Sequence, residues 1–355
     1  MTPTPIPTPA LTIDEAVVDR NIARMAEWAA RRGIALRPHA KTHKSVEIGR
    51  RQIAAGATGL TVATISEALV FARAGIDDLF IAYTVWVDDE KAIRLRELLQ
   101  LARVRIGVDS VAAARQLAGA IPPPERDRLS VLIEIDSGHH RSGVQPERAG
   151  ELAAEAQALG LRVVGVFTFP GHSYRPDGRA EAARDEAAAL HTAAEALTAR
   201  GVAVSVVSGG SSPSAEFADA DVLTELRPGV YALGDAQQWE LGSATSEQLA
   251  LQVLATVVSR GANHLIVDAG SKLLSSDRGA FSTGFGRLLD HPDARIEALS
   301  EHHATITHLD LPVGTRVRIV PNHACVAVNL SDAYAVTTRD GDVAFWPIDA
   351  RGCNA

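Results

Sequence analysis

Short apolar runs alternate with longer, alanine-rich stretches along the first two thirds of the chain. The runs have the length and the Val, Ile and Leu content of strands, whereas the stretches between them consist of strong helix formers. This alternation indicates βα units around a parallel sheet. Eight repeats over about 220 residues fit a (β/α)8 TIM barrel. The predicted strands are residues 34–37, 57–62, 78–83, 103–108, 130–136, 163–168, 203–207 and 229–232.

The pattern changes after Gly242, where strand-like runs are joined by turn residues and predict a β domain. We therefore divide the chain into an N-terminal arm (1–14) that can join the β domain, a barrel (15–240) and a C-terminal β domain (241–355). An open doubly wound sheet is the alternative, but no G-x-G-x-x-G follows the first strand. The runs in question are 251–258, 264–268, 304–309, 315–320, 324–330, 333–338 and 342–347.

The composition of the chain argues against nucleic-acid and membrane partners. The chain has 355 residues and a formal net charge of −8, and it contains no apolar run of membrane-spanning length. Nucleic-acid binding requires clustered Lys and Arg to neutralise phosphates. We therefore expect a cytoplasmic enzyme that acts on a small molecule, without a nucleic-acid or membrane partner.

A basic segment from Arg37 to Ser45 follows the first predicted strand. Side chains alternate along a strand, which puts Arg37, His39 and Lys41 on one side. A lysine that loses solvent beside cationic neighbours is pushed toward the neutral, nucleophilic form that a Schiff base requires. Lys44 falls at the start of the next helix and is expected to point elsewhere. Lys41 is thus the candidate catalytic lysine, with His39 beside it; a solvated basic loop is the alternative.

Polar groups also follow other predicted strands, at the end where a barrel keeps its reactive groups. After the fifth strand, Arg141 lies in a loop bounded by glycines. After the seventh, Ser208-Gly209-Gly210-Ser211 leads toward a predicted helix, and backbone N–H groups at a helix N-terminus favour phosphate. A plain Gly-Ser turn is the alternative. A lysine on the first strand and a phosphate cradle after the seventh together suggest pyridoxal phosphate (PLP).

The C-terminal domain contains a possible metal-binding pair. If Val320 to Cys325 is extended, His323 and Cys325 lie on one face and can chelate one ion. An imidazole with a thiolate is a soft pair that selects zinc over magnesium. The H-x-C spacing is short enough to occur by chance, and core packing of a buried cysteine is the alternative.

With these motifs assembled, the chain resembles the fold-type III PLP enzymes, and among them the D-serine dehydratase and D-threonine aldolase family. The resemblance covers nearly the whole chain. Its motifs are Arg37-Pro38-His39-Ala40-Lys41-Thr42-His43-Lys44, Asp136-Ser137-Gly138, Arg141-Ser142-Gly143, Ser208-Gly209-Gly210-Ser211, Arg227-Pro228-Gly229-Val230-Tyr231, Asp268-Ala269-Gly270-Ser271-Lys272 and Pro321-Asn322-His323-Ala324-Cys325.

The resemblance implies roles for residues around the cofactor. Lys41 would carry PLP as a Schiff base and act as the base at the substrate Cα. Arg141 would contact the phenolic oxygen, and Tyr174 is a candidate near the pyridine nitrogen. The phosphate would be held by the Ser208 to Ser211 loop together with Gly229 and Tyr231.

At the other end of the substrate, the resemblance implies that His323 and Cys325 bind a divalent metal beside the β-hydroxyl. Zinc is expected first, with manganese or magnesium as alternatives. His303 falls at a family histidine and is expected to be catalytic, but His302 replaces a family glutamate. The resemblance also implies a homodimer.

The resulting hypothesis is a PLP- and metal-dependent lyase acting on D-3-hydroxy amino acids. Cys325 favours a D-serine or other D-3-hydroxyamino acid dehydratase, because the aldolase pattern of the family has an acidic residue there. D-Threonine aldolase is the main alternative. An amino-acid racemase and a non-catalytic cofactor-binding protein are further ones.

Overall fold

The computed structural model describes residues 6–355, which form two compact units. The barrel unit comprises residues 25–41, 49–229 and 353–355. The sheet unit comprises the described residues up to Arg24, residues 42–48 and residues 230–352. The main division lies between Gly229 and Val230, compared with the expected boundary at 240. No helix among the described residues is long and apolar enough to cross a membrane.

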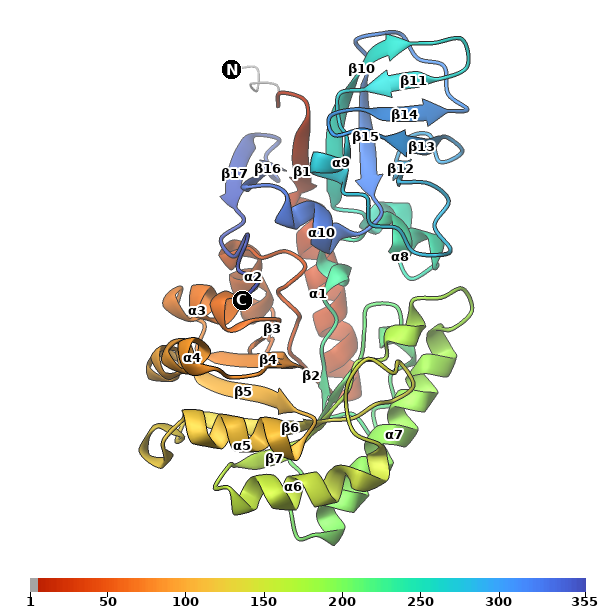
Figure 1. The fold of residues 1–355 in the computed structure, drawn as a ribbon. Coiled ribbons are helices and arrows are strands. Elements are labelled where there is room, and N and C mark those ends of the chain that lie inside the picture. The colour runs from red at the N-terminus through yellow and green to blue at the C-terminus, as the bar shows by residue number, and fades with distance from the viewer. Residues whose placement is uncertain (1–5) are drawn as a thin grey trace. The chain divides into compact units, whose positions relative to one another are not determined.

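Eight parallel strands form the sheet of the barrel unit (Figure 1), in the order β2-β9-β8-β7-β6-β5-β4-β3. The N–H groups of Thr58 and Thr61 donate to the carbonyls of Leu36 and Pro38, which joins β2 to β3 and closes the ring. The predicted (β/α)8 barrel with a second β domain is thus confirmed. The strands are β2 (Ala35–Leu36), β3 (Leu60–Val62), β4 (Asp78–Thr84), β5 (Arg103–Val108), β6 (Leu129–Glu134), β7 (Val163–Phe167), β8 (Val206–Gly209) and β9 (Glu225–Leu226).

Helices alternate with these strands, and several begin at side chains that accept a backbone N–H of the first turn. Thr64, Asp88 and Ser110 cap α3, α4 and α5 in this way, satisfying a donor that the helix leaves open. The helices are α1 (Glu15–Arg32), α2 (Val46–Ala54), α3 (Ile65–Arg73), α4 (Asp89–Leu101), α5 (Val111–Ala120), α6 (Ala149–Ala158) and α7 (Arg179–Ala199).

The eighth barrel strand lies earlier than predicted. It is Glu225–Leu226, while Val230–Ala232 forms the 3-10 helix η5. Buried bonds from Arg37 and Arg105 hold Glu225 in the barrel, and a local apolar pattern cannot reveal such distant partners. The helix predicted to follow the Ser208 to Ser211 loop is present only as the short 3-10 helix Ala215–Phe217 (η4), and a turn closed by the Asp219 carboxylate follows.

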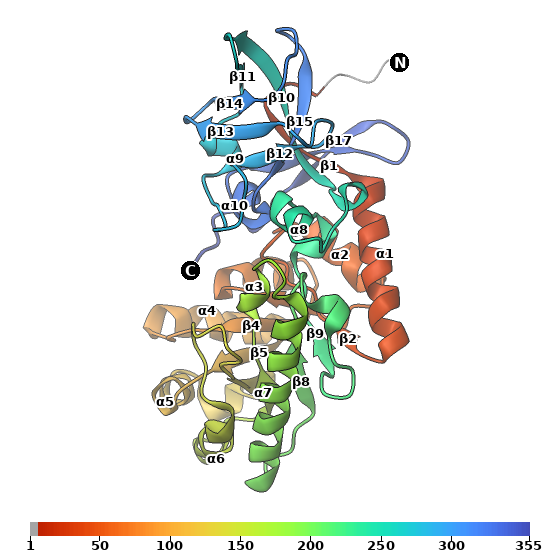
Figure 2. The same cartoon turned by 90° about the vertical axis from the view of Figure 1, so that its right-hand side faces the viewer.

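The sheet unit contains a mixed nine-stranded sheet (Figure 2), in which β1 pairs antiparallel with β10 and parallel with β16. The path runs β13-β14-β11-β10-β1-β16-β17, and β15 pairs with β10 and β12. The strands are β1 (Ala10–Asp14), β10 (Leu251–Arg260), β11 (Leu265–Val267), β12 (Gly286–Leu288), β13 (Arg295–Leu299), β14 (Ala304–Thr307), β15 (Arg316–Pro321), β16 (Ala333–Thr337) and β17 (Val343–Pro347).

Three short helices complete this unit: α8 (Ala236–Glu240), α9 (Ser271–Leu274) and α10 (Ala324–Asn329). The strand predicted over 324–330 is wrong, since α10 occupies it. Its start is fixed by the buried Asp235 carboxylate, which accepts the N–H of Ala324 at 3.0 Å. A carboxylate at a helix N-terminus stabilises the helical conformation.

Candidate active site

Lys41 lies beyond the carboxyl end of β2 among aromatic side chains. Its Nζ is 2.9 Å from the hydroxyl of Tyr83 on β4 and 5.6 Å from the centre of the Phe169 ring. The His39 ring lies edge-on to Tyr83, with 6.2 Å between centroids, and its Nδ1 accepts the Lys41 N–H at 3.4 Å. Lys44 is buried in the sheet unit with a positive φ of 49°. Lys41 and His39 therefore share one environment within the barrel unit, whereas Lys44 belongs to the sheet unit.

Arg141 shares the two aromatic rings of Lys41. Its guanidinium carbon lies 5.1 Å from the centre of Tyr83 and 5.2 Å from that of Phe169, within cation–π range. Sequence reasoning missed both rings, because Tyr83 belongs to an apolar strand run and Phe169 precedes a proline. Their positions at the carboxyl ends of barrel strands are the one indication that could have identified them.

The loop that carries Arg141 is held by two carboxylates. Asp136 accepts the N–H groups of Gly138 and His140 and contacts the His140 ring at 2.7 Å. Burial alone would raise the pKa of Asp136, but these hydrogen bonds outweigh it and the pKa lies below its usual range. Glu134 accepts bonds of 2.6 Å from both Ser142 and Thr84.

The Ser208 to Ser211 loop is bonded mainly to side chains. The Gly210 N–H donates to Glu186 Oε1 at 2.6 Å, and the Ser211 N–H donates to Ser214 Oγ at 3.1 Å. A chain of buried hydroxyls adjoins these amides: Ser173 is 2.9 Å from Ser211, and Ser211 is 2.8 Å from Ser214. Hydroxyls rotate to suit a partner, so they are the donors here most readily turned toward an anion.

The other three residues expected to bind the cofactor, Gly229, Tyr231 and Tyr174, lie in different segments of the fold. Gly229 ends the main segment of the barrel unit, and Tyr231 is buried in η5 of the sheet unit. Tyr174 follows the 3-10 helix η3 (Gly171–Ser173), and its ring centre is 6.3 Å from that of Phe169.

Two buried charges lie near the Ser208 to Ser211 loop: Arg227, which stands in a motif but was given no role, and Glu186, which sequence reasoning missed. Burial raises the pKa of Glu186, on α7, to about 7, although the Gly210 N–H and Arg227 oppose the rise. Burial lowers the pKa of Arg227 to about 10, against the attraction of buried carboxylates. Among the described residues, Glu186 Oε2 and Arg227 Nε have no hydrogen-bond partner. Nothing in the local sequence marks Glu186, which lies within a uniform helical stretch.

In the sheet unit, the start of α10 brings His323 and Cys325 together. The expectation of an extended pair is wrong: His323 is the N-cap of α10, and Cys325 lies in its first turn. Their side chains nevertheless interact, and Asp277 Oδ2 is 2.6 Å from His323 Nδ1. Burial lowers the pKa of His323, but Cys325, Asp277 and Asp235 outweigh it and raise the pKa to about 11.

Thr42, the residue directly after Lys41 in the chain, contacts Cys325 within the sheet unit. Its Oγ1 lies 3.2 Å from Cys325 Sγ. Among residues 6–355 there is no group of three or more His, Cys, Asp or Glu side chains arranged to hold a metal. A metal at His323 and Cys325 would therefore need further ligands from water or substrate. His303 is exposed in the turn between β13 and β14, where its carbonyl accepts the Ser300 N–H.

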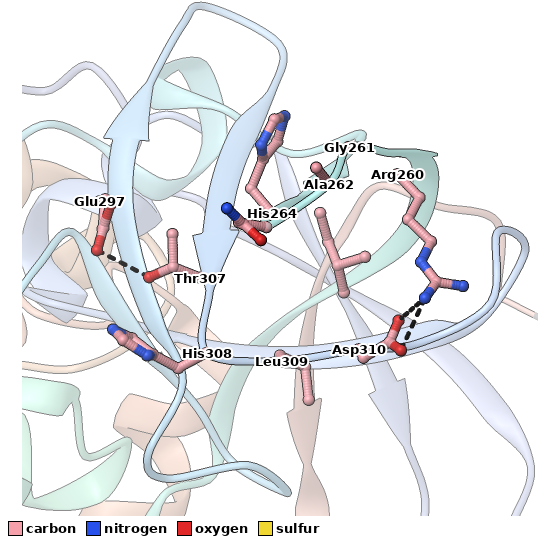
Figure 3. Close-up of a pocket in the computed structure, with 11 residues that line it drawn as sticks. Arg260, Gly261, Ala262, His264, Glu297, Thr307, His308, Leu309 and Asp310 are labelled. Carbon is pink, nitrogen blue, oxygen red and sulfur yellow. Dashed lines mark hydrogen bonds and ion pairs between the residues drawn. The ribbon is translucent and has the colours of Figure 1, made fainter.

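A pocket of about 660 Å³ lies in the sheet unit, beside the turn between β10 and β11 (Figure 3). It is bordered by the ion pair of Arg260 with Asp310, at 2.6 Å, and by a 2.8 Å bond from Thr307 to Glu297. None of the predicted site residues lines it, so size alone does not identify the candidate active site.

Comparison with known proteins agrees with this arrangement. The family model described as alanine racemase, N-terminal domain, matches residues 13–237, and the putative serine dehydratase domain matches residues 250–337. D-threo-3-Hydroxyaspartate dehydratase of Delftia sp. (strain HT23) is 38% identical, covering 96% of each chain. Its solved structure superposes with a TM-score of 0.87 at 36% identity, covering 96% of this chain and 97% of that one.

Two further relatives cover almost the whole chain. D-Threonine aldolase of Arthrobacter sp is 35% identical over 98% of this chain and 93% of its own. D-Serine dehydratase of Dictyostelium discoideum is 30% identical over 95% of this chain and 94% of its own. The resemblance drawn from the motifs is thereby confirmed. The chain belongs to the fold-type III, PLP-dependent lyases that join an alanine racemase-type barrel to a serine dehydratase domain.

Proposed function

We propose that the protein is a PLP- and divalent-metal-dependent dehydratase of D-3-hydroxy amino acids, which it converts to a 2-oxo acid and ammonia. The observation that carries the choice of dehydratase is the contact between His323 and Cys325 at the start of α10. The resemblance to the family implies that a histidine with a thiolate is the ligand pair of its dehydratase members.

The barrel unit offers groups that fit PLP. The Lys41 amine is available at the strand ends, 2.9 Å from Tyr83, and Arg141 supplies a positive charge over the same rings. The hydroxyls of Ser173, Ser211 and Ser214 are donors for a phosphate. When bound, PLP provides an electron sink for the charge that develops at the substrate Cα.

Lys41 is the group that we assign to removal of the Cα proton. The Tyr83 hydroxyl lies within hydrogen-bond distance of Lys41 Nζ, so it can orient the amine and accept a hydrogen bond from its protonated form. His39 fixes the backbone beside the lysine through its bond with the Lys41 N–H. Arg141, whose guanidinium lies over the same two rings as the Lys41 amine, would favour an anionic oxygen beside that amine.

In the sheet unit, His323 and Cys325 would hold the metal, and nitrogen with sulfur suits zinc better than manganese or magnesium. Asp277 bonds to His323 Nδ1 and so fixes the orientation of the ring, as carboxylates beside metal-binding histidines commonly do. The metal would act as a Lewis acid on the β-oxygen. A substituted form of a D-threo-3-hydroxyaspartate dehydratase was solved in a metal-free form, which supports metal dependence in a relative.

D-Threonine aldolase is the second candidate, favoured by the relative that is 35% identical over 98% of this chain. The same residues would then act on a β-hydroxyl that loses its proton, and the Cα–Cβ bond would break to give glycine and an aldehyde. A racemase has less support, since the alanine racemase of Clostridium difficile, at 14% identity, shows a likeness of fold alone.

Product analysis tests the proposal. The purified protein, supplied with PLP and either Zn²⁺ or Mn²⁺, is incubated with D-serine, D-threonine and D-threo-3-hydroxyaspartate and with their L-isomers. We expect a 2-oxo acid and an equal amount of ammonia from a D-isomer, lost on chelation and in Lys41→Ala. Glycine and an aldehyde as the only products would refute dehydration. We also propose a homodimer, which light scattering on the eluting protein would test.

A further inference from the structure

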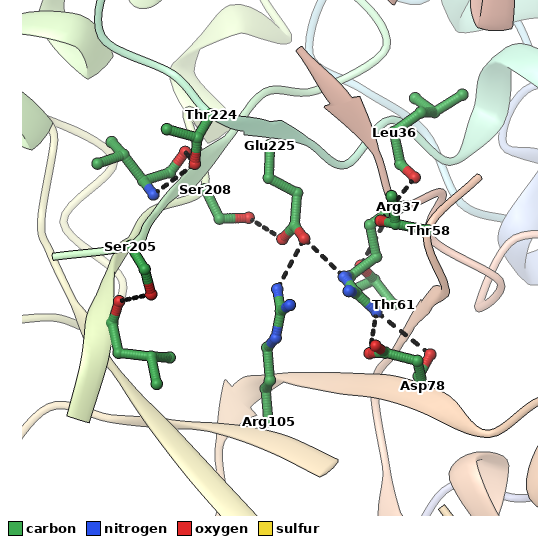
Figure 4. Close-up of polar contacts among 12 residues, drawn as sticks. Leu36, Arg37, Thr58, Thr61, Asp78, Arg105, Ser205, Ser208, Thr224 and Glu225 are labelled. Carbon is green, nitrogen blue, oxygen red and sulfur yellow. Dashed lines mark hydrogen bonds and ion pairs between the residues drawn. The ribbon is translucent and has the colours of Figure 1, made fainter. Parts of the chain in front are cut away.

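A layer of charged residues crosses the interior of the barrel near the amino-terminal ends of its strands (Figure 4). Arg37 is buried, and its guanidinium donates to Glu225 and to Asp78, each at 2.7 Å. Arg105 donates to the same Glu225 oxygen at 2.7 Å, and Ser208 donates to the other at 2.7 Å. Both carboxylates of this layer are therefore already paired.

Next to this layer lies a pocket of about 190 Å³ at the amino-terminal mouth of the barrel. Neighbouring strands contribute to it at or near their first residues, since Asp78 begins β4 and Arg103 begins β5. Its polar lining consists of four arginines, one aspartate and two serines: Arg103, Arg105, Arg128, Arg162, Asp78, Ser130 and Ser205.

Three of these arginines have positive charge that no carboxylate fully matches. Among the residues that the structure describes, Arg103 pairs only with the shared Asp78, at 3.4 Å, and Arg128 donates to the carbonyl of Gln100 at 3.0 Å. Among residues 6–355, the Arg162 guanidinium makes no hydrogen bond or ion pair. Like charges around one opening repel each other and focus a positive potential there. In a chain of net charge −8, this concentration favours an anionic ligand.

The pocket differs from the candidate active site. Strand β4 runs from Asp78 at the pocket to Tyr83 beside Lys41, five residues and roughly 17 Å along the strand. Val164 and Val206 line the pocket and pack against the apolar cluster of Phe80, Ala82, Leu132 and Phe167 inside the barrel. A ligand at the pocket would therefore not occupy the place proposed for PLP.

We propose that this pocket binds a small, multiply charged oxyanion of the phosphate type. The planar guanidinium presents paired donors that match phosphate oxygens, and several arginines can share one such anion. The volume is several times the roughly 30 Å³ that one water occupies, and it lies below the 300 Å³ or so at which pockets for larger ligands begin. The site suits inorganic phosphate or a small phosphate ester.

Titration calorimetry with inorganic phosphate tests this proposal. The protein is first saturated with PLP so that the place for the cofactor phosphate is taken, and ionic strength is kept constant with chloride. We expect saturable binding, with Kd rising at least about tenfold in Arg162→Ala and in Arg128→Ala, because each loses charge-assisted hydrogen bonds to the anion.

Arg115→Ala is the matched control, because it removes the same charge from an exposed position on α5 outside the pocket. Its Kd should equal that of the unaltered protein. Arg128 and Arg162 are exposed, so circular dichroism should show both variants folded. Absence of saturable binding, equal weakening in the Arg115 variant, or unchanged Kd in both pocket variants would overturn the proposal. The titration needs no turnover, so its outcome is independent of the reaction catalysed.

Discussion

Replacing Glu186 with Gln should stabilise the protein at alkaline pH and should stabilise it much less at pH 5. Burial raises the pKa of this carboxyl from 4.5 to about 7. An acid with a higher pKa in the folded state binds an extra proton on folding between those two values. Stability contributed by Glu186 therefore falls as pH rises through this window and is lowest above pH 7.

The size of the effect follows from the shift. Each pKa unit corresponds to 1.36 kcal/mol, so the ionised carboxylate costs roughly 3 kcal/mol at pH 8 relative to the unfolded chain. Gln keeps an oxygen for the Gly210 N–H, now 2.6 Å from Glu186 Oε1, but carries no charge to bury. Urea denaturation of both proteins at pH 5 and pH 8, followed by circular dichroism, measures the difference in unfolding free energy.

The exposed Glu155 on α6 provides the control, because Glu155→Gln makes the same chemical change without burial. Its effect should be within about 0.5 kcal/mol at both pH values, as for other surface changes. A Glu186→Gln protein that is less stable than the original at pH 8 would refute the reasoning. It would show that the carboxylate is held as an anion, with Arg227 as its counter-charge.

Three further predictions concern the two candidate sites and the barrel layer. Tyr83→Phe should retain the visible absorbance of bound PLP and lower kcat by roughly 10- to 100-fold, because Lys41 loses a hydrogen bond; unchanged kcat would exclude this role. Asp277→Asn should weaken metal affinity by about 10- to 100-fold in a competition titration with a chelating dye, because Asp277 orients the His323 ring. Asp290→Asn is the control, since Asp290 forms an ion pair with Arg318 rather than with His323. Glu225→Gln should destabilise the barrel by about 3–5 kcal/mol in urea, since Arg37 and Arg105 lose a buried partner; a loss below 1 kcal/mol would contradict this.

The barrel could be predicted from the sequence because its strands are buried, continuous apolar runs. Residues 163–168 were predicted, and the observed strand is Val163–Phe167. The prediction failed where distant contacts decide the structure. Residues 229–232 were predicted as the eighth strand because their pattern is apolar. The eighth strand instead begins at Glu225, whose carboxylate accepts hydrogen bonds from Arg37 and Arg105 inside the barrel. Strands β12 and β13 were missed because they are short and rich in charged residues and glycine.

The candidate site shows the same limit. Lys41, Arg141, His323 and Cys325 stand in recognisable motifs, so the sequence could nominate them. Tyr83, Glu186 and Asp277 are single residues in unremarkable segments, and only the folded chain places them beside those motifs. The H-x-C pair was nominated through an extended conformation that the helix α10 replaces.

The most direct test of the account is to identify the lysine that binds PLP. The protein is loaded with PLP, reduced with borohydride so that the Schiff base becomes a stable amine, digested and mapped by mass spectrometry. We predict the modification at Lys41 and its absence in Lys41→Ala, with Lys44→Ala modified as in the original protein. Modification at Lys44 or at another lysine, with Lys41 unmodified, would contradict the assignment on which the proposed function rests.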